Sequence, residues 1–267
     1  MTSAPKKQTA LITGASAGLG AHFAELAARD GFDVIVVARS EERLAQLKAR
    51  LEAQHHGTTV HVMPADLADP AAPKRLFDAV TAKGLTVDVL VNNAGFGTTG
   101  PFLDLPLEKE AEMVEVNCTA LLKLTHLFAG PMKARGAGRI LNIASTAGFQ
   151  AGPFMATYYA TKAFVVSFSE ALADELAGSG VSVTVSCPGA TATEFADRSG
   201  NAKNRLFQLR PPAKAEDVAA EAWSATQAGK TLVVHGFSNW LGVLGAQLAP
   251  RRVARNVARS LNLPPGK

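Results

Sequence analysis

The chain has 267 residues, of which 47% are hydrophobic, so it is long enough to bury a sizeable core and falls within the length of one α/β domain. Its formal net charge of +4, with 19% charged residues and no long cationic run, argues against a nucleic-acid partner. The two cysteines, Cys118 and Cys187, lie outside any CxxC spacing, so we expect neither a disulfide framework nor a metal site.

The chain starts with a short basic segment followed by the apolar run TALITG. This run is too short for the hydrophobic region of a signal peptide. No stretch of the sequence approaches the roughly 20 apolar residues that a membrane-spanning helix needs. We therefore expect a cytoplasmic protein without a membrane span.

The first elements alternate between strand and helix. Residues 9–13 (TALIT) form a short β-branched run, and the helical pattern that follows from Leu19 ends near Gly31. The uninterrupted apolar run 33–38 (DVIVVA) is typical of a parallel strand that helices cover on both faces. Ser40 is a suitable N-cap for the next helix.

The same alternation continues to residue 236. Further strands are predicted near 59–65, 88–94, 139–145, 181–187 and 231–236. Helical patterns lie near 70–83, 106–133, 155–178 and 214–228. These elements predict a single Rossmann-like α/β domain over residues 1–267, with a doubly wound, seven-stranded parallel sheet in three layers.

Two segments do not fit the alternation. Residues 194–213 are polar and irregular, which is typical of a loop that moves over a site, so we expect a substrate lid there. The basic residues of the segment 194–214 allow a second interpretation, in which the lid attracts an anionic substrate; they are Arg198, Lys203, Arg205, Arg210 and Lys214, against Glu194 and Asp197.

Residues 237–267 form a less regular C-terminal extension. Near its end, four arginines share a helix-like stretch with three apolar residues, Val253, Val257 and Leu261. We favour a helix packed on the domain, with its arginines in solvent or at a subunit contact; a helix lying on a membrane surface is the alternative. The arginines are Arg251, Arg252, Arg255 and Arg259.

A glycine-rich turn joins the first strand to its helix. The sequence TGASAGLG places Gly14, Gly18 and Gly20 at the carboxyl end of that strand, where a pyrophosphate can approach the backbone and the positive end of a helix. The spacing GxxxGxG is not the general dinucleotide fingerprint GxGxxG. Taken alone, the turn therefore leaves a purely structural role open.

The segment YYATK holds the only two tyrosines of the chain, Tyr158 and Tyr159, one helical turn before Lys162. Tyrosine is a suitable acid for the oxygen that becomes negative when hydride reduces a carbonyl, and a nearby cation lowers its pKa of about 10. Helix geometry allows either tyrosine to approach Lys162, so spacing within the segment does not choose between them.

Several motifs follow one another in the order of a known family. They are the glycine turn, NNAG at 92–95, Asn117, Ser145, Tyr158 with Lys162, and the dipeptide Pro188-Gly189. With these motifs, residues 8–195 resemble the classical short-chain dehydrogenase/reductases. The resemblance implies an oxidoreductase that interconverts a carbonyl and an alcohol, and family members commonly form dimers or tetramers.

The resemblance also implies the catalytic roles. The YxxxK motif and a serine thirteen positions upstream select Tyr158 as the proton donor, with Ser145 holding the substrate oxygen. Lys162 would bind the nicotinamide ribose and lower the pKa of Tyr158, and Asn117 would hold a water relay. Tyr159 lies about 100° around the helix from Tyr158, so we expect it to have a packing role, with substrate contact as the alternative.

The cofactor is expected to be NADP(H), with NAD(H) as the alternative. Arg39 follows the second strand, where arginine suits a 2′-phosphate and a carboxylate suits a ribose hydroxyl. The expected cofactor-binding residues are Gly14, Ser16, Ala17, Gly18, Leu19, Gly20, Arg39, Asp66, Leu67, Asn93, Ala94, Gly95, Tyr158, Lys162, Pro188, Gly189, Thr191 and Thr193.

The expected substrate pocket is mostly apolar and suits a hydrophobic ketone, aldehyde or secondary alcohol. Its predicted residues are Phe96, Phe149, Gln150, Phe154, Met155 and Phe195. A competing hypothesis keeps the fold but not the turnover: a nucleotide-binding module that senses redox state or binds a partner.

Overall fold

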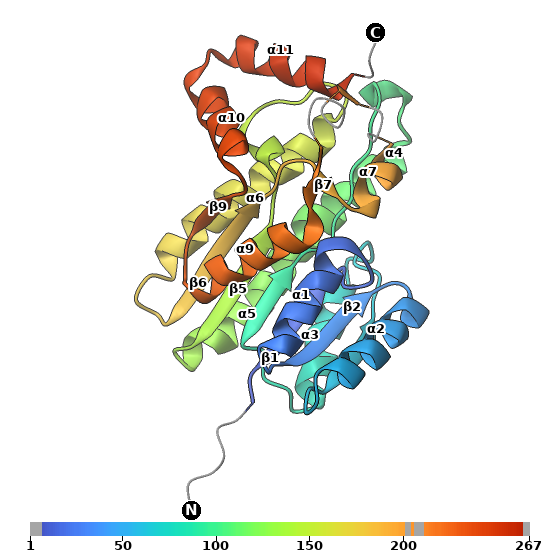
Figure 1. Ribbon diagram of the computed structural model, residues 1–267, viewed down its shortest axis with the longest axis vertical. Coiled ribbons are helices and arrows are strands. Elements are labelled where there is room, and N and C mark those ends of the chain that lie inside the picture. The colour runs from blue at the N-terminus through green and yellow to red at the C-terminus, as the bar shows by residue number, and fades with distance from the viewer. Residues whose placement is uncertain (1–6, 201–203, 206–210, 264–267) are drawn as a thin grey trace, which may run out of the picture.

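The computed structural model describes residues 7–200, 204–205 and 211–263, without the side chains of Asp197 and Arg198. In this part of the chain a seven-stranded parallel sheet has the order β3-β2-β1-β4-β5-β6-β9 (Figure 1). The strands are β1 (Thr9–Thr13), β2 (Asp33–Ala38), β3 (Val60–Pro64), β4 (Val89–Asn92), β5 (Gly138–Ile143), β6 (Val181–Cys187) and β9 (Leu232–Val234).

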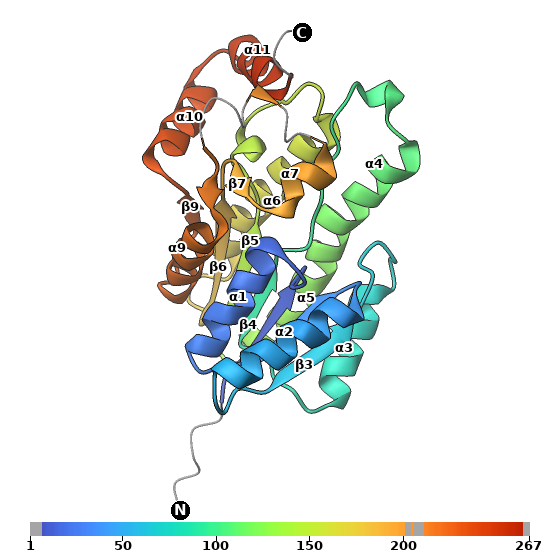
Figure 2. The ribbon, with the colours of Figure 1, turned by 45° about the vertical axis from the view of Figure 1, so that its right-hand side comes forward.

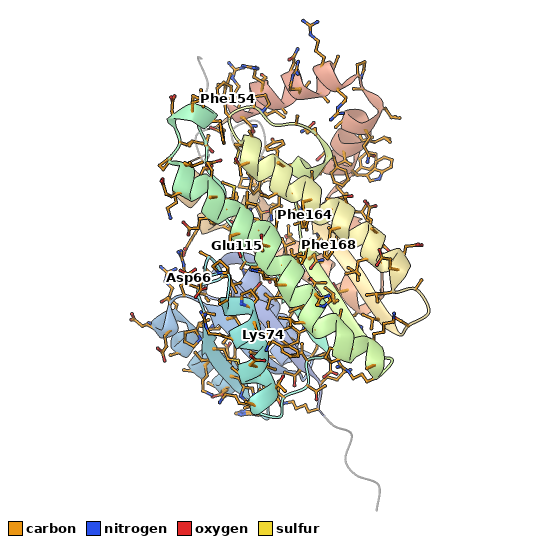
Figure 3. All side chains as sticks on the ribbon, turned by 180° about the vertical axis from the view of Figure 1, so that it is seen from behind. Asp66, Lys74, Glu115, Phe154, Phe164 and Phe168 are labelled. Atoms are coloured by element: carbon orange, nitrogen blue, oxygen red, sulfur yellow. The ribbon has the colours of Figure 1, made fainter. Side chains whose placement is uncertain are left out.

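Helices cover both faces of the sheet, which confirms the predicted three-layer Rossmann-like fold (Figures 1 and 3). Each face buries its own apolar cluster, because alternate residues of every strand point to opposite sides. One layer contains α1 (Gly18–Arg29), α2 (Glu41–Gln54) and α9 (Ala215–Gln227). The other contains α3 (Ala72–Ala82), α5 (Leu121–Ala134) and α6 (Ala156–Glu175).

The strand order reverses between β1 and β4. Both β2 and β4 pair with β1, with Ala10 opposite Val34 on one side and Val89 on the other. In a doubly wound sheet the crevice at the carboxyl ends of such a strand pair receives the ligand. This crevice therefore fixes where the functional site lies.

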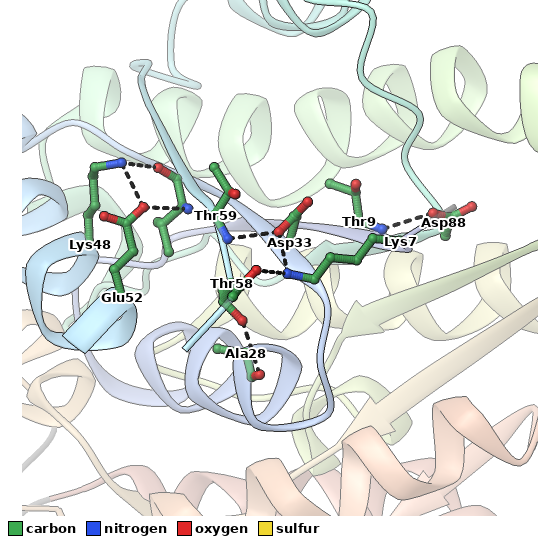
Figure 4. A network of polar contacts seen from close by, with 11 residues as sticks. Lys7, Thr9, Ala28, Asp33, Lys48, Glu52, Thr58, Thr59 and Asp88 are labelled. Carbon is green, nitrogen blue, oxygen red and sulfur yellow. Dashed lines mark hydrogen bonds and ion pairs between the residues drawn. The ribbon is translucent and has the colours of Figure 1, made fainter. Parts of the chain in front are cut away.

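Polar contacts hold the amino ends of the strands, which lie opposite the crevice at their carboxyl ends (Figure 4). Asp33 accepts hydrogen bonds from Lys7 Nζ and Thr59 N, both at 2.7 Å, and Asp88 accepts from Thr9 N at 2.8 Å. Glu52, in the last turn of α2, accepts from the amide of Val60 at the start of β3 at 2.9 Å. These carboxylates satisfy backbone amides at strand ends, which stabilises the amino edge without taking part in the site.

The predicted helix 106–133 is interrupted in the structure. It consists of α4 (Leu107–Val114), a π-helical segment (Glu115–Ala120) and α5. A π turn inserts one extra residue into a helix and is often found at functional sites. Here it contains Asn117.

The predicted lid region contains short elements, and residues 201–203 and 206–210, including Lys203 and Arg210, lie outside the described residues. The two strands β7 (Thr191–Ala192) and β8 (Ala213–Lys214) pair in parallel and flank α7 (Glu194–Ser199). The sequence indicated only an irregular loop here.

The C-terminal extension is helical, which corrects the expectation of an irregular tail. It consists of α10 (Phe237–Leu248) and α11 (Arg251–Asn262), which Figure 2 shows beyond β7 and α7 at one end of the molecule. In α11 the buried face carries Ala254, Ala258 and Asn262, whereas Val253 and Val257 are exposed. In the described residues, no helix has the length and apolar character that crossing a membrane requires.

Candidate active site

The glycine turn after β1 is tightly packed against the strand-end loop after β4. Asn93 Nδ2 donates to Thr13 O at 2.9 Å and to Gly14 O at 3.3 Å, while Thr13 Oγ1 accepts from the amides of Asn93 and Ala94, both at 3.0 Å. A Cβ atom on Gly20 would lie 2.2 Å from Gly14 O. Only glycine therefore allows the helix to start this close to the turn.

The first turn of α1 is suited to an anion. In the described structure its N-cap residue, Ala17, makes no side-chain capping hydrogen bond, so the first amides of the helix are not capped by that side chain. Unpaired amides and the helix dipole favour a pyrophosphate at this point. The turn thus fits the dinucleotide that the sequence led us to expect.

Asn117 is fixed by the backbone around it. Its Nδ2 donates to Phe96 O at 2.9 Å and to Thr161 Oγ1 at 3.1 Å, and its Oδ1 accepts from Phe96 N at 3.1 Å. A Cβ on Gly95 would lie 2.9 Å from this Oδ1 atom. The π turn therefore directs Asn117 onto the loop after β4, behind the predicted cofactor contacts.

Ser145 and Tyr158 lie side by side and are both nearly buried. Ser145 Oγ donates to Pro188 O at 3.2 Å and accepts from Ala147 N at 3.1 Å, which fixes the hydroxyl between β5 and β6. Burial raises the pKa of the Tyr158 hydroxyl above its ordinary value, and a hydrogen bond with Ser145 lowers it by less.

Lys162 lies in the same helix as Tyr158 and is also buried. Its Nζ atom donates to Ile143 O at 2.8 Å and lies 5.7 Å from the centre of the Tyr158 ring. Burial lowers the pKa of the Lys162 ammonium to about 8. The lowering of the tyrosine pKa that Lys162 was expected to cause does not appear in this structure, because loss of water around the Tyr158 hydroxyl has the largest effect and raises its pKa.

Ser145, Tyr158 and Lys162 line one cavity of about 1400 Å³, which extends from the glycine turn past Tyr158, whereas Asn117 is buried beside it and does not line it in the described structure. All the predicted cofactor residues line it except Gly20, which lies within the first turn of α1. Of the predicted substrate residues, Phe96, Gln150, Met155 and Phe195 line it, and the Phe195 ring lies 5.4 Å from that of Tyr158. A second, apolar part of the wall comes from the C-terminal helices: Gly242, Val243, Ala246, Val257 and Leu261.

Residues 8–204 match the short chain dehydrogenase family. The chain belongs to this family. The match confirms the resemblance inferred from the motifs, and it identifies the protein as an NAD(P)-dependent oxidoreductase acting on CH–OH and C=O groups.

The dehydrogenase is similar to the granaticin polyketide synthase putative ketoacyl reductase 1 of Streptomyces violaceoruber. The two are 39% identical over 194 residues, which cover 72% of this chain and 71% of that protein. Among the ketoacyl and 3-oxoacyl-CoA reductases to which the chain is similar, the match covers between 51% and 73% of the relative's length.

Two solved structures show the same fold with different cofactors. A short-chain dehydrogenase from Sphingobium yanoikuyae in complex with NADPH has a TM-score of 0.79 at 34% identity, covering 90% of this chain and 93% of that chain. A short chain dehydrogenase/reductase from Burkholderia phymatum in complex with NAD has a TM-score of 0.82 at 28% identity, covering 98% of both chains. The family therefore supports a nicotinamide dinucleotide cofactor, but it does not decide whether the adenosine ribose of that cofactor carries a 2′-phosphate.

Two predicted pocket residues of the dehydrogenase lie elsewhere in the described structure. Phe149 packs in the cluster beneath α6, with Val165 and Val166, and not in the cavity wall. Phe154 has a positive φ of 68° and lies beneath Arg259, whose guanidinium is 5.5 Å from its ring centre. Their positions in the loop between β5 and α6 suggested the pocket, but the backbone turns both rings away from it.

Sequence reasoning missed a second arginine that lines the cavity close to Arg39. Arg43, one turn into α2, lines the cavity beside Arg39. Arg39 Nη1 lies 3.9 Å from Glu112 Oε1, and Arg43 Nη1 lies 3.3 Å from Glu194 Oε2. Because Arg39 precedes the N-cap residue Ser40, the spacing of four residues between them gave no signal that the two arginines lie together.

Sequence reasoning also missed the contact between α10 and the Pro188-Gly189 loop. A Cβ on Gly189 would lie 2.5 Å from Asn239 Nδ2, and that same amide donates to His235 O at 2.8 Å. The start of α10 is therefore packed against the loop expected to contact the nicotinamide.

Proposed function

We propose that this dehydrogenase uses NADP(H) to interconvert a ketone or aldehyde and the corresponding alcohol, with Tyr158 transferring the proton. The observation that carries the proposal is that Ser145, Tyr158 and Lys162 all line the same cavity, with the Phe195 ring beside that of Tyr158. A structural role for these polar groups alone would not require them to face a cavity.

The chain's own residues would bind the substrate and move the proton. Ser145 Oγ, fixed by Ala147 N and Pro188 O, would hold the carbonyl oxygen beside Tyr158. Tyr158 would donate its proton to that oxygen. The nicotinamide, when bound, supplies or accepts the hydride at its C4 atom. Asn117 would hold the water relay behind Lys162.

The protonation of Tyr158 favours reduction at neutral pH. Because burial raises its pKa, the phenol keeps its proton there and is ready to donate it to a carbonyl oxygen. Alcohol oxidation needs the phenolate, so its rate should increase with pH above neutrality. A rate of oxidation that falls as the pH rises from 7 to about 10 would contradict this assignment.

The NADP(H) preference is supported by Arg39 and Arg43, whose guanidinium groups would bind a 2′-phosphate in place of their carboxylate partners Glu112 and Glu194. The test is the ratio of kcat/KM with NADPH to that with NADH. Arg43→Gln should lower this ratio at least about tenfold, given the usual strength of charge-assisted hydrogen bonds.

A matched control for Arg43 lies on the same helix. Arg50 is an exposed arginine of α2 paired with Glu25, and it does not line the cavity in the described structure. Arg50→Gln should leave the cofactor ratio unchanged. A clear preference of the unmodified enzyme for NADH would contradict the proposed cofactor.

The substrate is proposed to be a mostly apolar carbonyl compound with a bulky or extended group. The apolar wall formed by α10 and α11 beyond Tyr158 supports this, as does the similarity to ketoacyl reductases. A screen of ketones and aldehydes of increasing chain length should show kcat/KM rising with length. If kcat/KM does not change with the chain length of the substrate, the proposed substrate class is wrong.

A dimer or tetramer is proposed through the helices α4 to α6. Phe164 and Phe168 stack with parallel rings 5.7 Å apart on the outer side of α6 (Figure 3), and Leu122 of α5 is also exposed. Light scattering after gel filtration measures the mass directly. A monomer that remains monomeric at high concentration would contradict it.

A further inference from the structure

The outer face of α10 is apolar, aromatic and exposed. Five large side chains recur at positions i, i+3, i+4, i+7 and i+11 of this helix, so they form one stripe, which we call the α10 face. In this fully described helix only Val243 is buried. The α10 face consists of Phe237, Trp240, Leu241, Leu244 and Leu248, which are 73%, 49%, 47%, 37% and 78% exposed.

Such a face is not needed for the core of the domain. The side of α10 that faces the domain is provided by Val243, Gly242 and Ala246, which line the cavity. Exposed apolar patches of this size mark interaction sites, because leaving them in water is unfavourable. Phe237 and Trp240 stack 5.9 Å apart, so the aromatic end of the face is also ordered.

Positive charge adjoins the α10 face. Helix α11 follows immediately and carries four arginines, of which Arg251, Arg252 and Arg255 have no ion-pair partner among the described residues. From residue 237 to residue 267 the sequence contains no aspartate or glutamate. The apolar stripe is therefore bordered by cations without compensating carboxylates.

We propose that α10 and α11 dock this dehydrogenase on the surface of an anionic lipid bilayer. The α10 face would lie among the acyl chains at the interface, where tryptophan and phenylalanine are favoured, and the arginines would bind lipid phosphates. Helix α10 has 12 residues, which is too short to cross a bilayer and suits a helix lying in its plane.

A second copy of the chain fits this surface less well. In a twofold contact between two α10–α11 pairs, the same patch of each copy meets the other, so the arginines of both copies come together with no carboxylate from residues 237–267 to compensate them. Anionic lipid phosphates neutralise the same arginines. Charge complementarity therefore selects the lipid surface.

Docking would place the cavity close to the lipid. The helices whose outer side would meet the bilayer also line the apolar part of the cavity through Val257 and Leu261. An apolar carbonyl compound dissolved in the bilayer would then reach the cavity without crossing much water. This consequence rests on the proposed substrate class; the docking itself does not.

Vesicle binding tests the proposal, with co-sedimentation on phosphatidylcholine alone and on an equimolar mixture with phosphatidylglycerol. Intrinsic fluorescence gives an independent readout, because Trp240 is exposed whereas Trp223, the other tryptophan, is 2% exposed. We expect binding to the mixed vesicles, a blue shift of the emission and loss of binding in high salt. Phosphatidylcholine alone should bind far less.

One triple variant removes the arginines that would bind lipid phosphates, and a second removes apolar side chains of the α10 face. A third, which removes three distant lysines, is the charge-matched control. Arg251→Gln/Arg252→Gln/Arg255→Gln should weaken binding on the order of a hundredfold, at about fivefold per arginine near an anionic surface. Leu241→Ser/Leu244→Ser/Leu248→Ser keeps Trp240 and should weaken it at least about tenfold. Lys83→Gln/Lys133→Gln/Lys230→Gln removes the same amount of charge near the amino ends of the strands, far from α10 and α11, and should have little effect on binding.

Several results would overturn the proposal. They are failure of the unmodified protein to bind mixed vesicles, equal binding to both vesicle types, or equal losses in the arginine and lysine variants. A leucine variant that splits an oligomer while the unmodified protein ignores vesicles would assign the α10 face to a second copy. If a variant does not fold, the loss of vesicle binding by the unmodified protein in high salt still tests the lipid docking. Turnover of a water-soluble ketone tests the proposed reaction separately.

Discussion

Replacing Tyr159 with phenylalanine should reduce stability but not turnover. Tyr159 Oη donates to Asn262 Oδ1 at 3.1 Å, and Asn262, which is 2% exposed, donates through Nδ2 to Pro153 O at 2.9 Å. This pair attaches the end of α11 to α6. Phenylalanine keeps the buried ring but removes the hydroxyl donor, so the Asn262 oxygen loses this partner in a buried place.

An unpaired buried acceptor costs about 1–3 kcal/mol. For a chain of this size each 1 kcal/mol changes Tm by about 2–4 °C, so Tyr159→Phe should lower Tm by roughly 2–12 °C. Turnover should stay within about threefold, because the Tyr159 hydroxyl bonds to Asn262 and not to Ser145. Circular dichroism melting and a cofactor-oxidation assay measure the two effects.

The neighbouring tyrosine provides the matched control. Tyr158→Phe should remove nearly all turnover with a smaller change in Tm. An unchanged Tm for Tyr159→Phe would show that the hydroxyl does not hold α11. If Tyr159→Phe abolished turnover and Tyr158→Phe did not, the assignment of the proton donor would be wrong.

Two further predictions use the glycine turn and the buried lysine. Gly20→Ala should abolish cofactor binding and lower Tm, since its Cβ would lie 2.2 Å from Gly14 O, whereas Gly130→Ala in α5, with open space around its Cβ, should raise stability by up to about 1 kcal/mol; equal melting temperatures for the two would contradict this. Burial lowers the pKa of Lys162 from 10.5 to about 8, so between these pH values the native state releases a proton that the unfolded chain keeps. Lys162 should therefore add a rise of about 3 kcal/mol to the free energy of unfolding across this window, and urea titrations should show it as the difference between the unmodified protein and Lys162→Met; a parallel pH dependence in the two proteins would contradict the assignment.

The alternation of strands and helices could be predicted because burial on both faces leaves uninterrupted apolar runs. The run TALIT coincides with β1, and DVIVVA with β2. The π turn around Asn117 has no such signal, since one extra residue in a helix leaves the hydrophobic pattern almost unchanged. The π turn therefore becomes visible only in the structure, where it directs the side-chain amide of Asn117 to Phe96 and Thr161.

Of the two C-terminal helices, α11 was predicted and α10 was not, and the buried side of α11 differs from the expected one. The periodicity of α11 suggested that Val253, Val257 and Leu261 face the core, whereas small residues, Ala254 and Ala258, are buried instead. A helix that buries alanine and exposes valine does not follow the usual pattern; here Val257 and Leu261 line the cavity.

The site was predicted from family motifs more than from the chemistry of single residues. Spacing alone did not separate Tyr158 from Tyr159, and the structure separates them by their partners, Ser145 and Asn262. Arg43 escaped notice because an arginine in the first turn of an exposed helix resembles an ordinary surface residue. Its position became informative only once the cavity was known.

The most direct test of the account is a paired measurement on the unmodified enzyme and Tyr158→Phe: NADPH binding by fluorescence, and NADPH oxidation with a panel of apolar ketones and aldehydes. The account predicts that the unmodified enzyme binds NADPH and reduces at least one apolar carbonyl. Tyr158→Phe should bind NADPH with similar affinity and lose at least about a thousandfold of kcat, within the range expected for a proton donor. Tight NADPH binding with no oxidation across the panel, or full turnover in Tyr158→Phe, would contradict it, and the first result would favour a nucleotide-binding module without catalysis.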